Sequence, residues 1–170
     1  MEGKSFILGV LVDNEFGVLT RVAGMFARRG YNIDSLTVGP TEDPQISRMT
    51  IASYGDDYIK GQITKQLRKL NDVRQVTVLS DESSVTRELM LLKVTVEQER
   101  HREVMEAVNV YRAKVIDLSA HAITIEITGE VSKLDAFVEY MRPYGIAELT
   151  RTGATTIQRG ERRLVDLLEE

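Results

Sequence analysis

The sequence has 170 residues and a mass of 19.2 kDa, which suits one ordinary domain or two small ones. Its 26 acidic and 22 basic side chains give a net charge of −4, which argues against a general nucleic-acid binder. The absence of cysteine excludes disulfides, cysteine nucleophiles and cysteine-based zinc sites. No signal peptide is recognisable and no apolar run approaches the roughly 20 residues of a membrane span, so we expect a cytoplasmic protein with no membrane contact.

The first half of the chain predicts the order strand, helix, strand, strand, helix, strand. Apolar and β-branched residues alternate with polar ones in the expected strands and recur at helical spacing between them. Basic residues followed by a glycine end the first helix, and an aspartate caps the second. The expected elements are a strand at Ser5–Asp13, a helix at Gly17–Arg29, strands at Tyr31–Val38 and Ser47–Tyr54, a helix opened by Asp56 that carries Ile59, Ile63, Leu67 and Leu70, and a strand at Val73–Leu79.

The second half repeats this order. Asn32–Leu36 matches Val115–Ser119 at an offset of 83 residues, and Met49–Ile51 matches Ile123–Ile125 at an offset of 74 residues. The second copy therefore lacks nine residues where the first carries a loop at Gly39–Ile46. The expected elements are a strand at Arg87–Glu97, a helix at Glu99–Arg112, strands at Lys114–Ser119 and Ala122–Thr128, a helix at Val131–Tyr144 and a strand at Gly145–Arg151.

The repeat predicts an α+β fold with two βαββαβ domains, each a four-stranded antiparallel sheet with two helices on one face. We place the domains at residues 1–80 and 87–155, with a linker at 81–86 and a C-terminal tail at 156–170. The other face and the edges of such a small sheet need cover, which favours a homo-oligomer, most simply a twofold dimer. The apolar end of the tail, Leu164–Leu168, is either a short helix that packs on the body or a partner, or a frayed end.

No cluster of residues indicates catalysis. Acidic pairs such as Asp56–Asp57 and Asp81–Glu82 fit helix caps and solvated loops better than general acid–base pairs. His101 and His121 have no serine or aspartate partner at a motif spacing, and the sequence contains no Walker A loop, GxGxxG, HExxH or hydrolase elbow. We therefore predict no catalytic residues and no metal site in this chain.

The turn from Asp13 to Leu19 carries the clearest functional signal. A strand ends and a helix begins within a few residues, which leaves free backbone N–H groups at a positive helix end that suits a carboxylate. Gly17 lets a ligand approach the backbone closely, and Asn14 supplies both a donor and an acceptor. The spacing alone also fits a purely structural turn that Asn14 caps, so both interpretations stay open here.

A second amide lies at the far end of the same helix. In a twofold dimer, Asn32 of one chain would face the Asn14–Gly17 turn of the other, and a free amino acid fits between them. Its carboxylate would accept from the N–H groups of Gly17 and Val18, and its ammonium would donate to Asn14 and Asn32. The candidate apolar wall for its side chain consists of Val12, Leu19 and Ile33.

The second repeat lacks these features. At the same offset of 83 residues, Arg100 replaces Gly17 and Val115 replaces Asn32. We therefore expect the ligand site in the first domain only, with the second domain in a supporting or docking role.

Two stretches resemble the small regulatory subunit of acetolactate synthase, an ACT-domain family. They are VLVDNEFGVLTRVAGMFARRGYNIDSLTVGPT at Val10–Thr41 and SRMTI at Ser47–Ile51. The resemblance continues through Lys65–Val73, Arg87–Val94, Leu134–Phe137 and Ala147–Gly153, and it covers the chain to about Arg163.

The resemblance implies two tandem ferredoxin-like domains and a subunit that is not itself catalytic. Its partner would be a large catalytic subunit that uses thiamine diphosphate, Mg²⁺ and FAD, whose activity it raises and makes sensitive to feedback inhibition by valine, sometimes by leucine or isoleucine. The effector would bind at a homodimer interface of the ACT domains. The matching positions are Asn14, Gly17, Val18 and Leu19 of one chain and Asn32 and Ile33 of the other.

A stand-alone amino-acid-sensing ACT protein that acts on another partner is the alternative. Co-purification with a large thiamine-dependent subunit would separate the two hypotheses.

Overall fold

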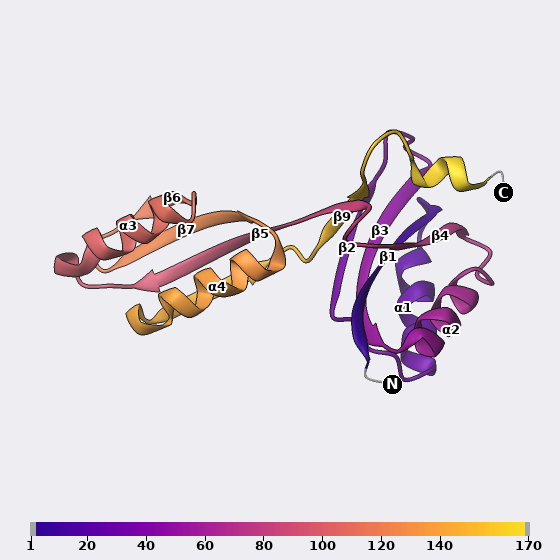
Figure 1. Cartoon of the computed structure of the whole chain (residues 1–170), viewed down its shortest axis with the longest axis horizontal. Helices are drawn as coiled ribbons and strands as arrows, with labels where there is room; N and C mark the ends of the chain where they lie inside the picture. The colour runs from indigo at the N-terminus through magenta and orange to yellow at the C-terminus, as the bar shows by residue number, and fades with distance from the viewer. Residues whose placement is uncertain (1–2, 169–170) are drawn as a thin grey trace. The chain divides into compact units, whose positions relative to one another are not determined.

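The computed structural model describes residues 3–168 and divides the chain into two compact units (Figure 1). The first unit contains residues 3–86 and 154–168, and the second contains Arg87–Gly153. We placed the end of the second domain at residue 155, whereas the chain rejoins the first unit at Ala154. The two-domain α+β fold predicted from the repeat is confirmed by the element order of each unit.

The first unit is an antiparallel sheet of order β2-β3-β1-β4 with two helices on one face (Figure 1). Alternate residues of β1 point into the core beneath the helices, which is why Leu8, Val10 and Val12 are almost fully buried. Its elements are β1 (Lys4–Asp13), α1 (Val18–Arg28), β2 (Ser35–Pro40), β3 (Ile46–Gly55), α2 (Asp57–Leu67) and β4 (Val73–Leu79).

One strand begins later than the sequence predicts. We expected the second strand from Tyr31, but β2 begins at Ser35. The Tyr31 N–H donates to the Phe26 carbonyl at 3.0 Å and so closes the end of α1, where Gly30 takes a positive φ of 69°. Residues 31–34 therefore turn the chain from the helix to the sheet.

The second unit repeats the architecture with a sheet of order β6-β7-β5-β8. Its core joins Met90, Leu92 and Val94 of β5 to Phe137 and its neighbours on α4. Short 3-10 turns at Gln98–Arg100 and Arg142–Tyr144 flank the helices, which are correspondingly shorter than predicted. Its elements are β5 (Ser84–Thr95), α3 (His101–Val110), β6 (Lys114–Leu118), β7 (Ala122–Gly129), α4 (Val131–Met141) and β8 (Ile146–Arg151).

The chain itself covers part of the outer face of the first sheet. A short strand β9 (Thr155–Gln158) and a 3-10 helix η3 (Leu164–Leu168) return to the first unit after β8. Leu164 is 3% exposed and packs against Leu11 and Leu79. Gly9 makes room for it, because a Cβ there would lie 3.0 Å from a Leu164 methyl carbon. The apolar end of the chain therefore docks on its own body.

This cover changes the argument for an oligomer. We derived an oligomer from uncovered sheet faces and edges, and in the first unit residues 154–168 cover part of one such face. On the outer face of the second sheet, Lys93 pairs with Glu148 at 3.3 Å and Lys114 with Glu126 at 3.9 Å across neighbouring strands. The homodimer stays a prediction that rests on the sheet edges and on the family resemblance.

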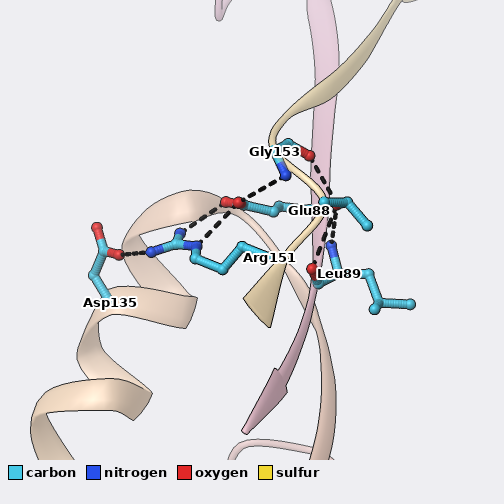
Figure 2. A network of polar contacts seen from close by, with 6 residues as sticks. Glu88, Leu89, Asp135, Arg151 and Gly153 are labelled. Carbon is cyan, nitrogen blue, oxygen red and sulfur yellow. Dashed lines mark hydrogen bonds and ion pairs between the residues drawn. The ribbon is translucent and has the colours of Figure 1, made fainter. Parts of the chain in front are cut away.

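A buried ion pair joins the two strands by which the chain enters and leaves the second unit (Figure 2). Glu88 is 6% exposed and accepts from Arg151 Nε at 3.0 Å and from Arg151 Nη2 at 2.7 Å. Its Oε1 also accepts from the Gly153 N–H at 3.2 Å, and Arg151 Nη1 donates to Asp135 at 2.6 Å. The hydrogen bond to Glu88 raises the pKa of Arg151. The network ties the start of β5 to the end of β8.

No helix within residues 3–168 has the length and apolar content needed to cross a membrane.

Candidate functional site

The turn between β1 and α1 has the geometry of an anion site. Gly17 precedes the helix with φ +84° and ψ −6°, a left-handed conformation that favours glycine. Among the described residues, no side chain caps the start of α1, and its first turn carries no acidic residue. The first N–H groups of α1 are thus left without a side-chain acceptor at the positive end of an 11-residue helix. This helix start is therefore suited to bind a ligand carboxylate.

Asn14 is fixed beside this helix end by three hydrogen bonds. Its backbone N–H donates to the Gln45 carbonyl at 2.8 Å, and its side-chain Nδ2 donates to the Pro44 carbonyl at 2.9 Å. Its Oδ1 accepts from Ser47 Oγ at 3.0 Å. Asn14 therefore does not cap α1 but joins the turn to the loop at 40–46. The second N–H of the amide and the second lone pair of its oxygen are not used by these bonds.

Arg21 lies beside the candidate site and was not predicted from the sequence. Its Nε donates to Asp72, and a Cβ added to Gly17 would lie 3.0 Å from Arg21 Nη1. The hydrogen bond to Asp72 raises the pKa of Arg21, with nearby Glu15 acting in the same direction. A guanidinium thus lies beside the left-handed glycine. The signal was present in the sequence, because Arg21 follows Gly17 by one helical turn.

The apolar residues around the turn fall into two groups. Val12 and Val18 are 1% and 3% exposed, so within one chain they support the turn from the core. Leu19 is about half exposed, and Phe16 in the turn is fully exposed. A fully exposed apolar side chain beside an uncapped helix start is typical of a surface that a ligand or a partner covers. Phe16 is the second residue that the sequence analysis missed.

The structure does not bring Asn32 and Ile33 to the turn of the same chain. They follow α1, whereas the turn precedes it, and 11 residues of α-helix span roughly 16 Å. Asn32 Nδ2 donates to Asp34 at 2.6 Å, and Ile33 is half buried against the core. Only a second chain can place these two residues at the turn, as the dimer hypothesis requires.

The matching position in the second unit has a different structure. The chain passes through the 3-10 turn Gln98–Arg100 before α3, and Arg100 has a φ of −100°. The Arg100 guanidinium lies 4.4 Å from the centre of the Tyr144 ring and hydrogen-bonds to Glu103. The helix start of the first unit thus has a left-handed glycine that the matching position of the second unit lacks. Throughout residues 3–168, no three acidic or histidine side chains form a group able to hold a metal ion.

Two family models match the chain. An AHAS small subunit-like ACT domain matches residues 8–75, and a small subunit of acetolactate synthase model matches residues 87–160. A probable acetolactate synthase small subunit of Methanothermobacter thermautotrophicus is 47% identical over 165 residues, 96% of this chain and 98% of that protein. The chain belongs to the acetolactate synthase small-subunit family.

Further members of the small-subunit family agree with this assignment. The small subunit of Mycobacterium bovis is 46% identical over 162 residues, which cover 95% of this chain and 96% of that one. The crystal structure of the acetolactate synthase small subunit from Thermotoga maritima superposes with a TM-score of 0.87 at 40% identity, over 94% of this chain and 99% of that one. The fold predicted by the family resemblance is thereby confirmed.

Proposed function

We propose that this small subunit binds the catalytic subunit of acetolactate synthase, raises its activity and makes it sensitive to feedback inhibition by valine. Thiamine diphosphate, Mg²⁺ and FAD would belong to the catalytic subunit, and this chain would supply the effector site. The observation that supports the proposal most is the left-handed Gly17 at an uncapped helix start, with a guanidinium beside it.

The polar groups of the turn suit the α-carboxylate and α-ammonium groups of an amino acid. The N–H groups of Gly17 and Val18 would donate to the carboxylate of valine, and the charge of Arg21 would strengthen that binding. The remaining lone pair of Asn14 and the side-chain oxygen of Asn32 from a second chain would accept from its ammonium.

The side chain of the effector needs an apolar wall. Leu19 and Phe16 offer exposed apolar surface on one chain, and Ile33 of a second chain would complete it. Val12 and Val18 lie behind this surface and hold its shape. Wall residues of this kind set the choice among aliphatic side chains by about 1–3 kcal/mol.

A ligand that bridges two chains can act as a switch. Valine would inhibit if it binds one arrangement of the dimer about 1–3 kcal/mol better than the other. Asn14 contacts both the effector turn and the loop at 40–46, which the second repeat lacks. This loop is therefore the segment that would transmit a structural change in the turn to a neighbouring surface.

The test is a pair of glycine variants assayed in the holoenzyme reconstituted with the catalytic subunit. Gly17→Asp adds a Cβ toward Arg21 and a negative charge where the carboxylate would bind. Gly160→Asp is the matched control, because Gly160 also has a positive φ, but a Cβ added there would meet no atom within 4 Å. We expect Gly17→Asp to abolish valine inhibition and keep activation, and Gly160→Asp to keep both.

Two results would contradict the proposal. Normal valine inhibition of the Gly17→Asp holoenzyme would refute the site. Failure of the wild-type chain to bind or activate any acetolactate synthase catalytic subunit, with valine binding intact, would favour the stand-alone sensor instead.

A further inference from the structure

A cavity lies within the first unit, and none of its lining residues belongs to the β1–α1 turn. It has a volume of about 460 Å³ and is enclosed by the loop at 40–46, the outer face of the sheet and residues 157–165. This volume lies in the range of small-molecule sites. Its apolar lining consists of Leu11, Ile46, Ile157, Leu164 and Val165, and its charged lining consists of Glu42, Asp43, Arg48, Arg162 and Arg163.

The apolar part of this cavity is built on packed side chains. Leu11 and Leu164 are 4% and 3% exposed and belong to one packed cluster, with Ile46 half buried beside them. Ile157 on β9 is 62% exposed and forms the open side. An aliphatic group placed here would bury surface against a preformed wall, which is favourable.

Arg48 is the unusual residue of this cavity. It lies on the outer face of β3, opposite Leu11 of β1, and is half buried. Within residues 3–168, its side chain donates one hydrogen bond, from Nη2 to the Thr156 carbonyl at 2.6 Å, and forms no ion pair. Burial lowers the pKa of Arg48, and the charge of Glu42 opposes this shift. A desolvated guanidinium normally has an anionic partner.

Two of the other four charged groups of the cavity have partners, and Arg162 is exposed to solvent. Arg163 pairs with Asp166, and Asp43 Oδ1 accepts from the Gln45 N–H at 2.9 Å inside its own turn. Glu42 is exposed and near enough to raise the pKa of Arg163, with the pairing to Asp166 as the larger cause. Arg48 is therefore the partly buried cation that faces the apolar wall. Glu42 is the nearby acidic group that would compete with a ligand carboxylate for Arg48.

We propose that this cavity is a second ligand site, which takes a small aliphatic carboxylate of about five or six carbons. Its carboxylate pairs with Arg48, and its hydrocarbon part packs on Leu11, Ile46 and Leu164. All of these residues belong to the first unit of one chain, so the site does not depend on the proposed effector function or on a dimer.

The test is calorimetric titration of the full chain with ligands that share one skeleton and differ in charge. The probe is 4-methylpentanoate, and its comparisons are 4-methylpentan-1-ol, 4-methylpentan-1-amine, leucine and decanoate. We expect the acid to bind at one site per chain, at least about tenfold more tightly than the alcohol or the amine. Tighter binding of leucine would show a zwitterion site, and tighter binding of decanoate would show a fatty-acid or lipid site; either overturns the assignment.

Four variants locate the binding. Ile157→Trp fills the cavity from an exposed position and should abolish binding, whereas Val38→Trp, on an exposed position of β2 outside the lining, should not. Glu42→Gln removes the competing charge and should tighten binding about three- to tenfold. Glu99→Gln, an equal change of charge in the second unit, should leave it unchanged.

Two more variants separate this site from the effector turn. Arg48→Met should weaken 4-methylpentanoate binding at least about tenfold, and Gly17→Asp should leave it unchanged. Binding that survives both Ile157→Trp and Arg48→Met would refute the site. Loss of 4-methylpentanoate binding in Gly17→Asp would place the carboxylate at the β1–α1 turn instead.

Discussion

Replacing Arg151 by methionine should destabilise the second unit strongly, because it leaves the Glu88 carboxylate buried without its partner. Glu88 is 6% exposed and receives two of its three hydrogen bonds from Arg151 (Figure 2). The third comes from the Gly153 N–H at 3.2 Å and remains in the variant.

The magnitude follows from burial. Removing one member of a fully buried ion pair costs about 3–5 kcal/mol. Arg151 is 26% exposed and the Gly153 donor persists, so we expect Arg151→Met to lower the free energy of unfolding by about 2–3 kcal/mol. Asp135→Asn removes the other partner of Arg151, but Asp135 is 56% exposed, so that variant should cost less than about 1 kcal/mol. Adding Glu88→Gln to Arg151→Met should recover part of the loss, since no buried charge remains.

The assay is urea unfolding by circular dichroism at pH 7, with hydrogen exchange of the β8 amides to assign the loss to the second unit. Equal decreases in the free energy of unfolding for Arg151→Met and Asp135→Asn would refute the reasoning.

Three further predictions concern the first unit. The Asp56 side chain caps α2 by accepting a 2.8 Å hydrogen bond, so Asp56→Ala should cost about 1 kcal/mol in urea unfolding, while Asp57→Ala in the same turn should cost much less. Leu164→Ala should weaken docking of the C-terminal segment by about 2–3 kcal/mol, and unchanged hydrogen-exchange protection there would contradict this. The hydrogen bond from Arg163 lowers the pKa of Asp166 in the folded chain. Their pairing therefore stabilises the docked segment above the pKa of Asp166 in the unfolded chain, and this stabilisation is lost as the pH falls through the lower pKa of the folded chain. An acid titration by NMR that shows no change at either residue would argue against the pairing.

The regular elements were predictable because their apolar periodicity is strong. Each helix presents buried residues at helical spacing, such as Val18, Val22 and Phe26 on α1, and the central strands alternate as expected. The internal repeat then fixed the order of elements twice, so an error in one copy would have been visible against the other.

The C-terminal strand was not predictable in this way. In β9 the buried residue is Thr156, and the apolar Ile157 is 62% exposed, which inverts the usual pattern. Thr156 can be buried because its hydroxyl hydrogen-bonds to that of Thr86 at 2.9 Å and its carbonyl accepts from Arg48, which satisfies its polar groups. These partners lie 70 and 108 residues away along the chain, and periodicity within a short window carries no such information.

The candidate site was predictable in part. The helix start and Gly17 followed from local spacing, and the structure shows the left-handed backbone that the glycine permits. The role of Asn14 differs from a helix cap because its partners, Pro44 and Ser47, come from another strand connection. Arg21 could have been found from its place one helical turn after Gly17, but its partner Asp72 lies 51 residues further on and was not predictable from local spacing.

The proposed effector site places valine between the turn of one chain and Asn32 of another. Mixing two defective variants tests it directly. Neither Gly17→Asp nor Asn32→Ala alone should bind valine, because each homodimer lacks one half of every site. In the mixed dimer, the Asn32→Ala chain supplies an intact turn and the Gly17→Asp chain supplies an intact Asn32. Calorimetry should therefore show one valine site per mixed dimer. If mixing and exchanging the two variants restores no binding, the two-chain site is wrong.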